Sequence, residues 1–301
     1  MHIPEFPDSK KLTLNNKENI SNFISRFPPY ADYNFTAMFC YNINDTIQVS
    51  WLNGNLVVLF QNIITGELYF SFLGENLATE TAFTLLNHCR QADIKDKLCY
   101  IPECTRKHIN DQGLTITEDR DNNDYILSTG AFSLLKGNAY KEKRNAINKF
   151  HRIHPSHHTE IIDLESEKIQ QQVNTLYLNW IENKKAGSNE TEYEYKAFTR
   201  LMENSRHFNV TALGIYVDDK LAAFNIFEIL DNAYAICHFG KYDISVTGVF
   251  TFLLKETTAF LQDNHVEFLN FEQDLGIAGL RESKLQLRPV DFLKKYIINK
   301  K

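Results

Sequence analysis

Acidic and basic side chains gather between Asn270 and Pro289 at spacings that suit the binding of an anion. Glu272 and Asp274 precede a run with helical periodicity, and the positive end of a helix dipole favours carboxylates. Asp274 is a preferred N-cap type, so we expect it to cap this helix. Arg281 and Lys284 are three residues apart and share one helical face. This face is either a solvated surface or the wall of an anion-binding site.

Glu272 is the candidate general base of this segment. Its carboxylate follows a strand predicted at 266–271, and an apolar setting there would raise its pKa. One positioned base is sufficient for acyl transfer to an amine or hydroxyl when the protein also orients the reactants. His238 and Tyr242 are weaker candidates for the same role.

A second group of bases lies on a helix predicted at 140–151. Lys141, Arg144 and Asn148 are spaced i, i+3, i+7 and line one side of this helix. Lysine and arginine suit phosphate, and arginine can bind two oxygens at once. A solvated charged face is the alternative. We hypothesise that this helix and the helix of Arg281 form two sides of one anionic-substrate site.

Histidines are dense between His151 and His158, on both sides of Pro155. Imidazoles bind zinc and nickel, but this spacing matches no familiar metal site. Pro155 interrupts the helix that would align the rings, so we expect a solvated loop and no metal. The five cysteines contain no C-x₂-C pair, which also disfavours zinc, and we expect them to be buried thiols.

Composition limits the class of protein. The 301 residues are 43 % hydrophobic and 13 % aromatic, enough for a large core in one or two domains. The formal net charge of −6 argues against a protein that coats DNA or RNA, but it allows a local basic groove for one RNA end. No apolar run reaches the roughly 18–20 residues of a membrane span. The N-terminus shows no signal sequence, so we expect a cytoplasmic protein.

Two successive sets of predicted elements position these residues. The first set has strands at 46–52, 56–61 and 68–73, a helix at 81–92 and a strand at 98–101. The second has strands at 210–217, 221–230 and 233–239, a helix at 249–262 and the strand at 266–271. The Asn53-Gly54 turn is a strong hairpin signal. Both halves show a meander, a helix and a strand, which indicates a mixed α/β fold.

Several segments together carry a resemblance to a bacterial family. They are Asp32–Thr36, Glu118–Tyr125, Lys141–Phe150, His238–Asp243 and Asn270–Pro289. In order and spacing they resemble the C-terminal domain of phosphatidylglycerol lysyltransferase. The resemblance implies two tandem GNAT-like acyltransferase units, an arrangement that is also seen in Fem-type transferases, which take amino acids from aminoacyl-tRNA.

The acidic, Asn-rich stretch at 119–124 is turn-prone, so we expect a domain boundary there. It would separate a degenerate N-terminal GNAT-like unit at 1–122 from a C-terminal unit at 123–301 that carries the site. The resemblance also implies a phosphate loop. GNAT enzymes hold a pyrophosphate with backbone N–H groups before the helix that follows the meander. The matching residues here are Ser245, Thr247 and Gly248. Phe250 stands where a small residue is usual, which puts coenzyme A binding in doubt.

The expected function is transfer of an aminoacyl or acyl group, with aminoacyl-tRNA as the implied donor. The acceptor would be an amine or hydroxyl, such as a lipid head group at a membrane surface or a small metabolite. One alternative is an N-acyltransferase that uses acyl-CoA as its cofactor. The other is a catalytically silent protein that binds an anion or a lipid.

Overall fold

The computed structural model describes residues 2–62, 65–90, 94–184, 189–230 and 233–301. The chain divides into two compact units, of which the first comprises 1–125 and 273–301 and the second 126–272. The expected division at 122/123 differs from this, because residues 273–301 belong to the first unit rather than to the second. The chain therefore begins in the first unit, forms the second unit as an insertion, and returns.

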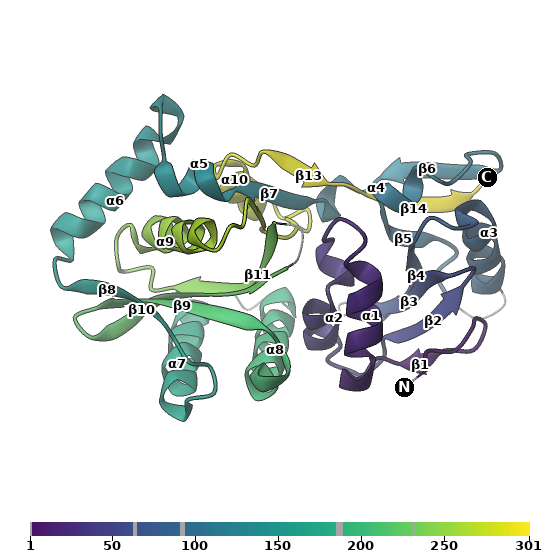
Figure 1. Cartoon of the computed structure of the whole chain (residues 1–301), viewed down its shortest axis with the longest axis horizontal. Coiled ribbons are helices and arrows are strands. Elements are labelled where there is room, and N and C mark those ends of the chain that lie inside the picture. The colour runs from purple at the N-terminus through teal and green to yellow at the C-terminus, as the bar shows by residue number, and fades with distance from the viewer. Residues whose placement is uncertain (1, 63–64, 91–93, 185–188, 231–232) are drawn as a thin grey trace. The chain divides into compact units, whose positions relative to one another are not determined.

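A seven-stranded sheet forms the centre of the first unit (Figure 1). Its strands are β1 (Lys10–Lys11), β2 (Gln48–Leu52), β3 (Asn55–Gln61), β4 (Leu68–Leu73), β5 (Leu98–Pro102), β6 (Leu114–Glu118) and β14 (Lys295–Lys300). Strands β2, β3 and β4 make an antiparallel meander, and β5 runs parallel to β4. The C-terminal strand β14 lies antiparallel between β5 and β6, so the end of the chain completes this sheet.

Helices cover both faces of the first sheet. Successive side chains of a strand point to opposite faces, and apolar side chains lie on both. Leu85 and Leu86 of the helix that follows the meander pack with Leu59 and Phe72 of the strands. Phe60 follows Leu59 in β3 and so points to the other face of the sheet, where its ring lies 6.3 Å from that of Tyr33. The α-helices outside the sheet are α1 (Lys17–Ile24), α2 (Phe35–Tyr41), α3 (Ala78–Cys89), α4 (Glu103–Arg106) and α10 (Ala278–Leu285).

The second unit repeats this topology. The second seven-stranded sheet consists of β7 (Asp124–Ser128), which begins at the end of the first unit, β8 (His157–Ile161), β9 (Val210–Val217), β10 (Lys220–Ile229), β11 (Tyr234–Tyr242), β12 (Phe268–Asn270) and the short strand β13 (Asp291–Leu293). Strands β9, β10 and β11 form an antiparallel meander, β12 is parallel to β11, and β7 is antiparallel to β12. Its helices are α5 (Thr129–Leu134), α6 (Lys141–Ile153), α7 (Glu167–Lys184), α8 (Asn189–Glu203) and α9 (Val249–Asp263).

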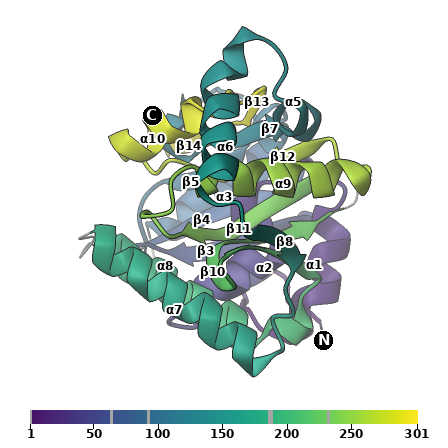
Figure 2. The ribbon, with the colours of Figure 1, turned by 90° about the vertical axis from the view of Figure 1, so that its left-hand side faces the viewer.

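Both units place the same elements in the same order. Each has a short edge strand, two helices, a three-stranded meander, a helix and a parallel strand. These are β1, α1, α2, β2–β4, α3 and β5 in the first unit, and β8, α7, α8, β9–β11, α9 and β12 in the second. In the second unit α6 and α9 lie on one face of the sheet, and α7 and α8 on the other (Figures 1 and 2). The fold is therefore mixed α/β with two tandem GNAT-like units, as predicted.

The local predictions succeed along most of the chain. Asn53 and Gly54 both have positive φ, as the predicted hairpin turn requires. The prediction was wrong for the cap of the C-terminal helix, because α10 begins at Ala278 with Ile277 as its N-cap residue. Asp274 lies before that helix. The histidine run was also predicted wrongly, because its second half lies in strand β8 rather than in a loop.

Candidate functional site

The parallel strand pair of the second unit is short. β12 pairs with β11 only at residues 234–236 and 268–270. β11 continues to Tyr242, and its pairing with β10 passes over His238, which forms a bulge. Beyond Ile236, β11 has no strand partner on its β12 side within the described part of the chain.

Glu272 follows β12 by two residues. Its φ of +56° lies in the left-handed region, which residues other than glycine rarely adopt. Its backbone N–H donates to the side-chain oxygen of Asn270 over 2.8 Å, and its side chain is half-buried. Uncommon backbone conformations of this kind gather at functional sites. Its role as the base stays a prediction.

The turn before α9 carries Ser245, Thr247 and Gly248. Gly248 is the N-cap residue of α9 and has a φ of +83°. A Cβ there would lie 2.6 Å from the carbonyl oxygen of Ala146 in α6. The glycine is therefore needed for α6 to pack against the start of α9, whether or not a ligand binds. Ser245 and Thr247 are exposed.

Asp243 takes up hydrogen-bond donors of this turn. Its Oδ1 accepts from the backbone N–H of Ser245 over 2.8 Å and from the Ser245 hydroxyl over 2.6 Å. The ring of Phe250 packs on that of Tyr242, with centroids 5.1 Å apart. The backbone N–H of Ser245 therefore already has an acceptor within the protein.

Helix α6 brings bases to the same part of the second unit, since it lies beside α9 in both views (Figures 1 and 2). Lys141 and Asn148 are exposed, and their side chains make no hydrogen bond or ion pair within the described residues. Arg144 differs, because its Nη1 donates to the carbonyl oxygens of Leu135 and Gly137. It thus supports the C-terminal end of α5, where a cation is favoured.

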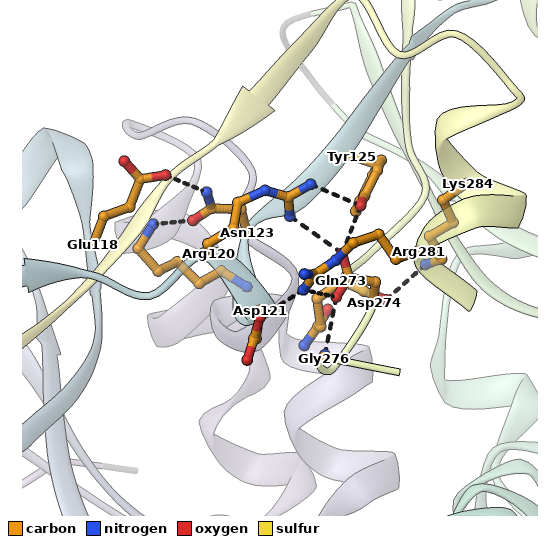
Figure 3. A network of polar contacts seen from close by, with 11 residues as sticks. Glu118, Arg120, Asp121, Asn123, Tyr125, Gln273, Asp274, Gly276, Arg281 and Lys284 are labelled. Atoms are coloured by element: carbon orange, nitrogen blue, oxygen red, sulfur yellow. Dashed lines mark hydrogen bonds and ion pairs between the residues drawn. The ribbon is translucent and has the colours of Figure 1, made fainter. Parts of the chain in front are cut away.

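A second cluster, in the first unit, surrounds Asp274 (Figure 3). The buried carboxylate accepts from the Tyr125 hydroxyl over 2.5 Å and from Nη1 of Arg120 over 3.2 Å. Arg281 donates to both carboxylate oxygens, over 2.7 and 3.0 Å. Burial alone would raise the pKa of Asp274, but the hydrogen bonds from Arg281 and Tyr125 hold it well below its ordinary value.

The predicted anion-binding residues of α10 have protein partners in this cluster. Besides Asp274, Arg281 pairs with Asp121 over 2.5 Å. Lys284 is only 7 % exposed, and its ammonium donates to the carbonyl oxygen of Gln273 over 2.8 Å. About one third of the Arg281 side chain is exposed, and its Nη1 donates to no described residue. The structure thus uses these bases in an internal network, and anion binding by them stays a prediction.

Segments far apart in the sequence meet in the same unit. The side-chain amide of Gln273 donates to Asp32 over 3.2 Å. The fully buried Lys295 pairs with Asp124 over 2.6 Å and with Asp32. Burial raises the pKa of Asp32, and the charge of Lys295 opposes this shift. Sequence reasoning missed these partners, although Asp32 and Asp124 lie in two of the segments that carry the family resemblance.

The two predicted sides of one anionic site lie in different units. Lys141, Arg144 and Asn148 belong to the second unit, together with Ser245, Thr247, Gly248 and Glu272. Arg281 and Lys284 belong to the first. The hypothesis that all of them line one site stays a prediction. Within the described residues, no three His, Cys, Asp or Glu side chains gather as a metal would need, and no helix could cross a membrane.

Comparison with known proteins adds a family and a fold. The family model described as "Phosphatidylglycerol lysyltransferase, C-terminal" matches residues 25–299. A conserved protein of unknown function from Bacteroides thetaiotaomicron has a similar structure, with a TM-score of 0.86, 24 % identity, and 97 % of this chain and 99 % of that chain covered. L-PGS from Bacillus licheniformis is similar with a TM-score of 0.62, 14 % identity, and 100 % and 94 % covered. No curated protein matches the chain.

Proposed function

The chain belongs to the phosphatidylglycerol lysyltransferase C-terminal family, and from this premise we propose that it transfers an aminoacyl group from aminoacyl-tRNA to an amine or hydroxyl acceptor. One observation carries the choice of donor. In the turn before α9, the carboxylate of Asp243 accepts the backbone N–H of Ser245. The basic helix α6 packs directly against the same turn at Gly248. This combination disfavours a pyrophosphate held in the turn and favours the backbone phosphates of an RNA end beside it.

The proposed chemistry is attack by the acceptor on the ester carbonyl carbon of the aminoacyl group. A new amide or ester bond forms, and the ester bond to the terminal ribose of the tRNA breaks. Glu272 takes the proton of the attacking amine or hydroxyl, and the leaving ribose oxygen gains a proton.

The bases have separate proposed roles. Lys141 and Asn148, which are exposed, contact phosphate directly. Arg144 keeps α5 in place with Nη1 and presents its remaining N–H groups to the same phosphates. Arg281 and Lys284 act through Asp274 and Gln273, which immediately follow Glu272, and so fix the backbone after the base.

Binding of charged tRNA and of coenzyme A, compared at two salt concentrations, tests the donor. The double variant Lys141→Glu/Lys149→Glu reverses two exposed charges on α6, and we expect it to weaken tRNA binding about tenfold or more at low salt. The matched control Lys168→Glu/Lys220→Glu changes two exposed lysines of the same unit and should bind as the wild type does. Equal losses in both variants would contradict a tRNA site on α6.

Other outcomes select the alternatives. Binding of coenzyme A without charged tRNA would replace the proposed donor by acyl-CoA. Binding of neither would favour the catalytically silent protein.

A single-turnover assay tests the base. We expect Glu272→Gln to slow transfer from aminoacyl-tRNA to phosphatidylglycerol vesicles or to a free amine by about 10²–10⁴-fold. Binding of charged tRNA should be unchanged, because the substitution leaves α6 intact. A fully active Glu272→Gln protein would remove Glu272 from this role.

A further inference from the structure

Two imidazoles from different elements face each other in the second unit. His151 in the last turn of α6 and His157 at the start of β8 have ring nitrogens Nδ1 and Nε2 only 3.0 Å apart. Nδ1 of His157 lies within hydrogen-bond distance of the His154 carbonyl oxygen. A carbonyl oxygen only accepts, so Nδ1 of His157 carries the proton, and its Nε2 accepts a hydrogen bond from Nδ1–H of His151.

Aromatic packing holds both rings in place. Phe150 and Phe252 stack with centroids 4.6 Å apart. The ring of His157 lies 4.8 and 5.2 Å from these two rings, and that of His151 lies 5.8 and 5.1 Å from them. His151 remains exposed, so an ion can reach the pair from solvent.

The positive and negative charges that lie near the two histidines largely neutralise each other. Lys255 and Glu256 of α9 form an ion pair over 2.9 Å, and Glu256 also accepts from Thr159 of β8 over 3.4 Å. Burial and the neighbouring His157 lower the pKa of His151 below its ordinary value.

We propose that His151 and His157 bind one divalent transition-metal ion where α6 meets β8. With metal–nitrogen bonds of about 2.0–2.1 Å, nitrogens 3.0 Å apart subtend about 95° at the ion. This is the angle between neighbouring ligands in the tetragonal sites of Cu²⁺ and Ni²⁺, whereas tetrahedral Zn²⁺ needs a wider one. When the ion binds, the proton on Nδ1 of His151 moves to Nε2 of the same ring by exchange with water, and a rotation of the rings about χ2, which is a soft torsion, turns both lone pairs towards the ion.

The surroundings of the pair agree with this role. Metal-bound histidines usually donate their second ring N–H to a carbonyl or carboxylate oxygen, as His157 does to His154. Among the described residues no group of three ligands forms, so water completes the coordination and the affinity is moderate. A bound ion would tie the end of the basic helix α6 to β8 and so stabilise the position of that helix.

Titration calorimetry on tag-free protein with CuCl₂, NiCl₂ and ZnCl₂ at pH 7.5 tests the proposal. We expect one ion per chain and the affinity order Cu²⁺ above Ni²⁺ above Zn²⁺ at this angle. His151→Gln and His157→Gln should each weaken binding by about tenfold or more. The control is His158→Gln, because His158 adjoins the pair but stacks on Tyr216 with centroids 4.9 Å apart. It should bind Cu²⁺ as the wild type does.

Electron paramagnetic resonance of the Cu²⁺ complex gives a second readout that does not depend on affinity. We expect coupling to two imidazole nitrogens in the wild type and to one in His157→Gln. Undetectable binding, or equal weakening in His158→Gln and His157→Gln, would overturn the proposal. Thermal melting by circular dichroism distinguishes a lost ligand from an unfolded variant.

Discussion

The two units carry different side chains at equivalent places of one topology. In each, the residue two positions after the parallel strand pairing has a φ of +56°, Tyr100 after Leu98 and Glu272 after Asn270. Tyr100 packs edge-on against Tyr69 with centroids 5.4 Å apart, so aromatic rings occupy this position in the first unit. The second unit has a half-buried carboxylate there. The same backbone conformation thus positions a packed aromatic ring, Tyr100, in the first unit and a carboxylate, Glu272, in the second.

The three-stranded meanders of the two units also differ, in the regularity of their strand pairing. Strands β3 and β4 pair in unbroken register from Leu56 to Gln61. The corresponding strands β10 and β11 shift register at His238. A bulge redirects side chains and increases local twist, and such irregularities are common near functional sites. The first unit is therefore the more regular scaffold, and the second has the features of a site.

One contact recurs in both units and marks them as copies. An asparagine of the middle meander strand donates to a threonine of the following helix, over 3.0 Å in the first unit and 2.9 Å in the second. A Cβ on a nearby glycine would lie 2.2 Å from the asparagine oxygen in each case. The residues are Asn55, Thr81 and Gly74 in the first unit, and Asn225, Thr257 and Gly240 in the second. This repeat is not visible in the sequence, because the intervals between these residues differ.

Lys295→Met should have the largest effect on stability, because it breaks the buried ion cluster of the scaffold unit. Lys295 and Asp124 are fully buried, and Asp32 is about one tenth exposed. Removing the cation leaves two carboxylates without compensation, and we expect a loss of about 3–5 kcal/mol. Urea unfolding at pH 7 measures it.

Lys241→Met in the second unit is the matched comparison. Lys241 is nearly as buried as Lys295 and pairs with Glu194 over 2.7 Å, but about one third of the Glu194 side chain is exposed. That carboxylate can regain water, so we expect a smaller loss of about 1–2 kcal/mol. Equal losses in the two variants would refute the contrast between a dry cluster in the first unit and an open pair in the second.

Asp274→Asn should cost about 2–3 kcal/mol at pH 7, because two arginines lose their shared buried acceptor. Its folded pKa lies below its ordinary value of 3.8, so the native carboxylate stabilises the fold above that pH. This contribution is lost as pH falls through 3.8 towards the lower folded pKa. Urea unfolding from pH 7 to pH 3 should therefore show the wild type and Asp274→Asn converging. A difference that is constant with pH would contradict the assigned pKa direction.

Gly248→Ala should cost about 1–3 kcal/mol. Its φ of +83° strains any side chain, and its Cβ would collide with the Ala146 carbonyl oxygen. Gly66→Ala is the control, because its φ of +73° is similar but nothing lies within 4 Å of the added Cβ. We expect about 1 kcal/mol for the control. Similar thermal-melting shifts in both would show that close packing of α6 on α9 is not what requires Gly248.

The sequence by itself determined the local elements of both units. Asn53-Gly54 predicted a hairpin turn because few other residues adopt positive φ at two successive positions. Apolar spacing predicted α9 almost to the residue, from 249 to 262 against Val249–Asp263. Short polar strands such as β8 and β14 were missed, because alternation over five or six residues with charged ends gives a weak signal.

Only the tertiary structure decided which charges meet. Asp274 is a preferred cap residue by type, yet it became the acceptor of Arg281 and of Arg120, which lies 154 residues earlier in the chain. Arg144 looked like a phosphate ligand and holds carbonyl oxygens of α5. The last strand completed the first sheet instead of the second unit. Local spacing sets which face a side chain shares, but burial and long-range strand pairing determine its partner, and neither is encoded within one segment.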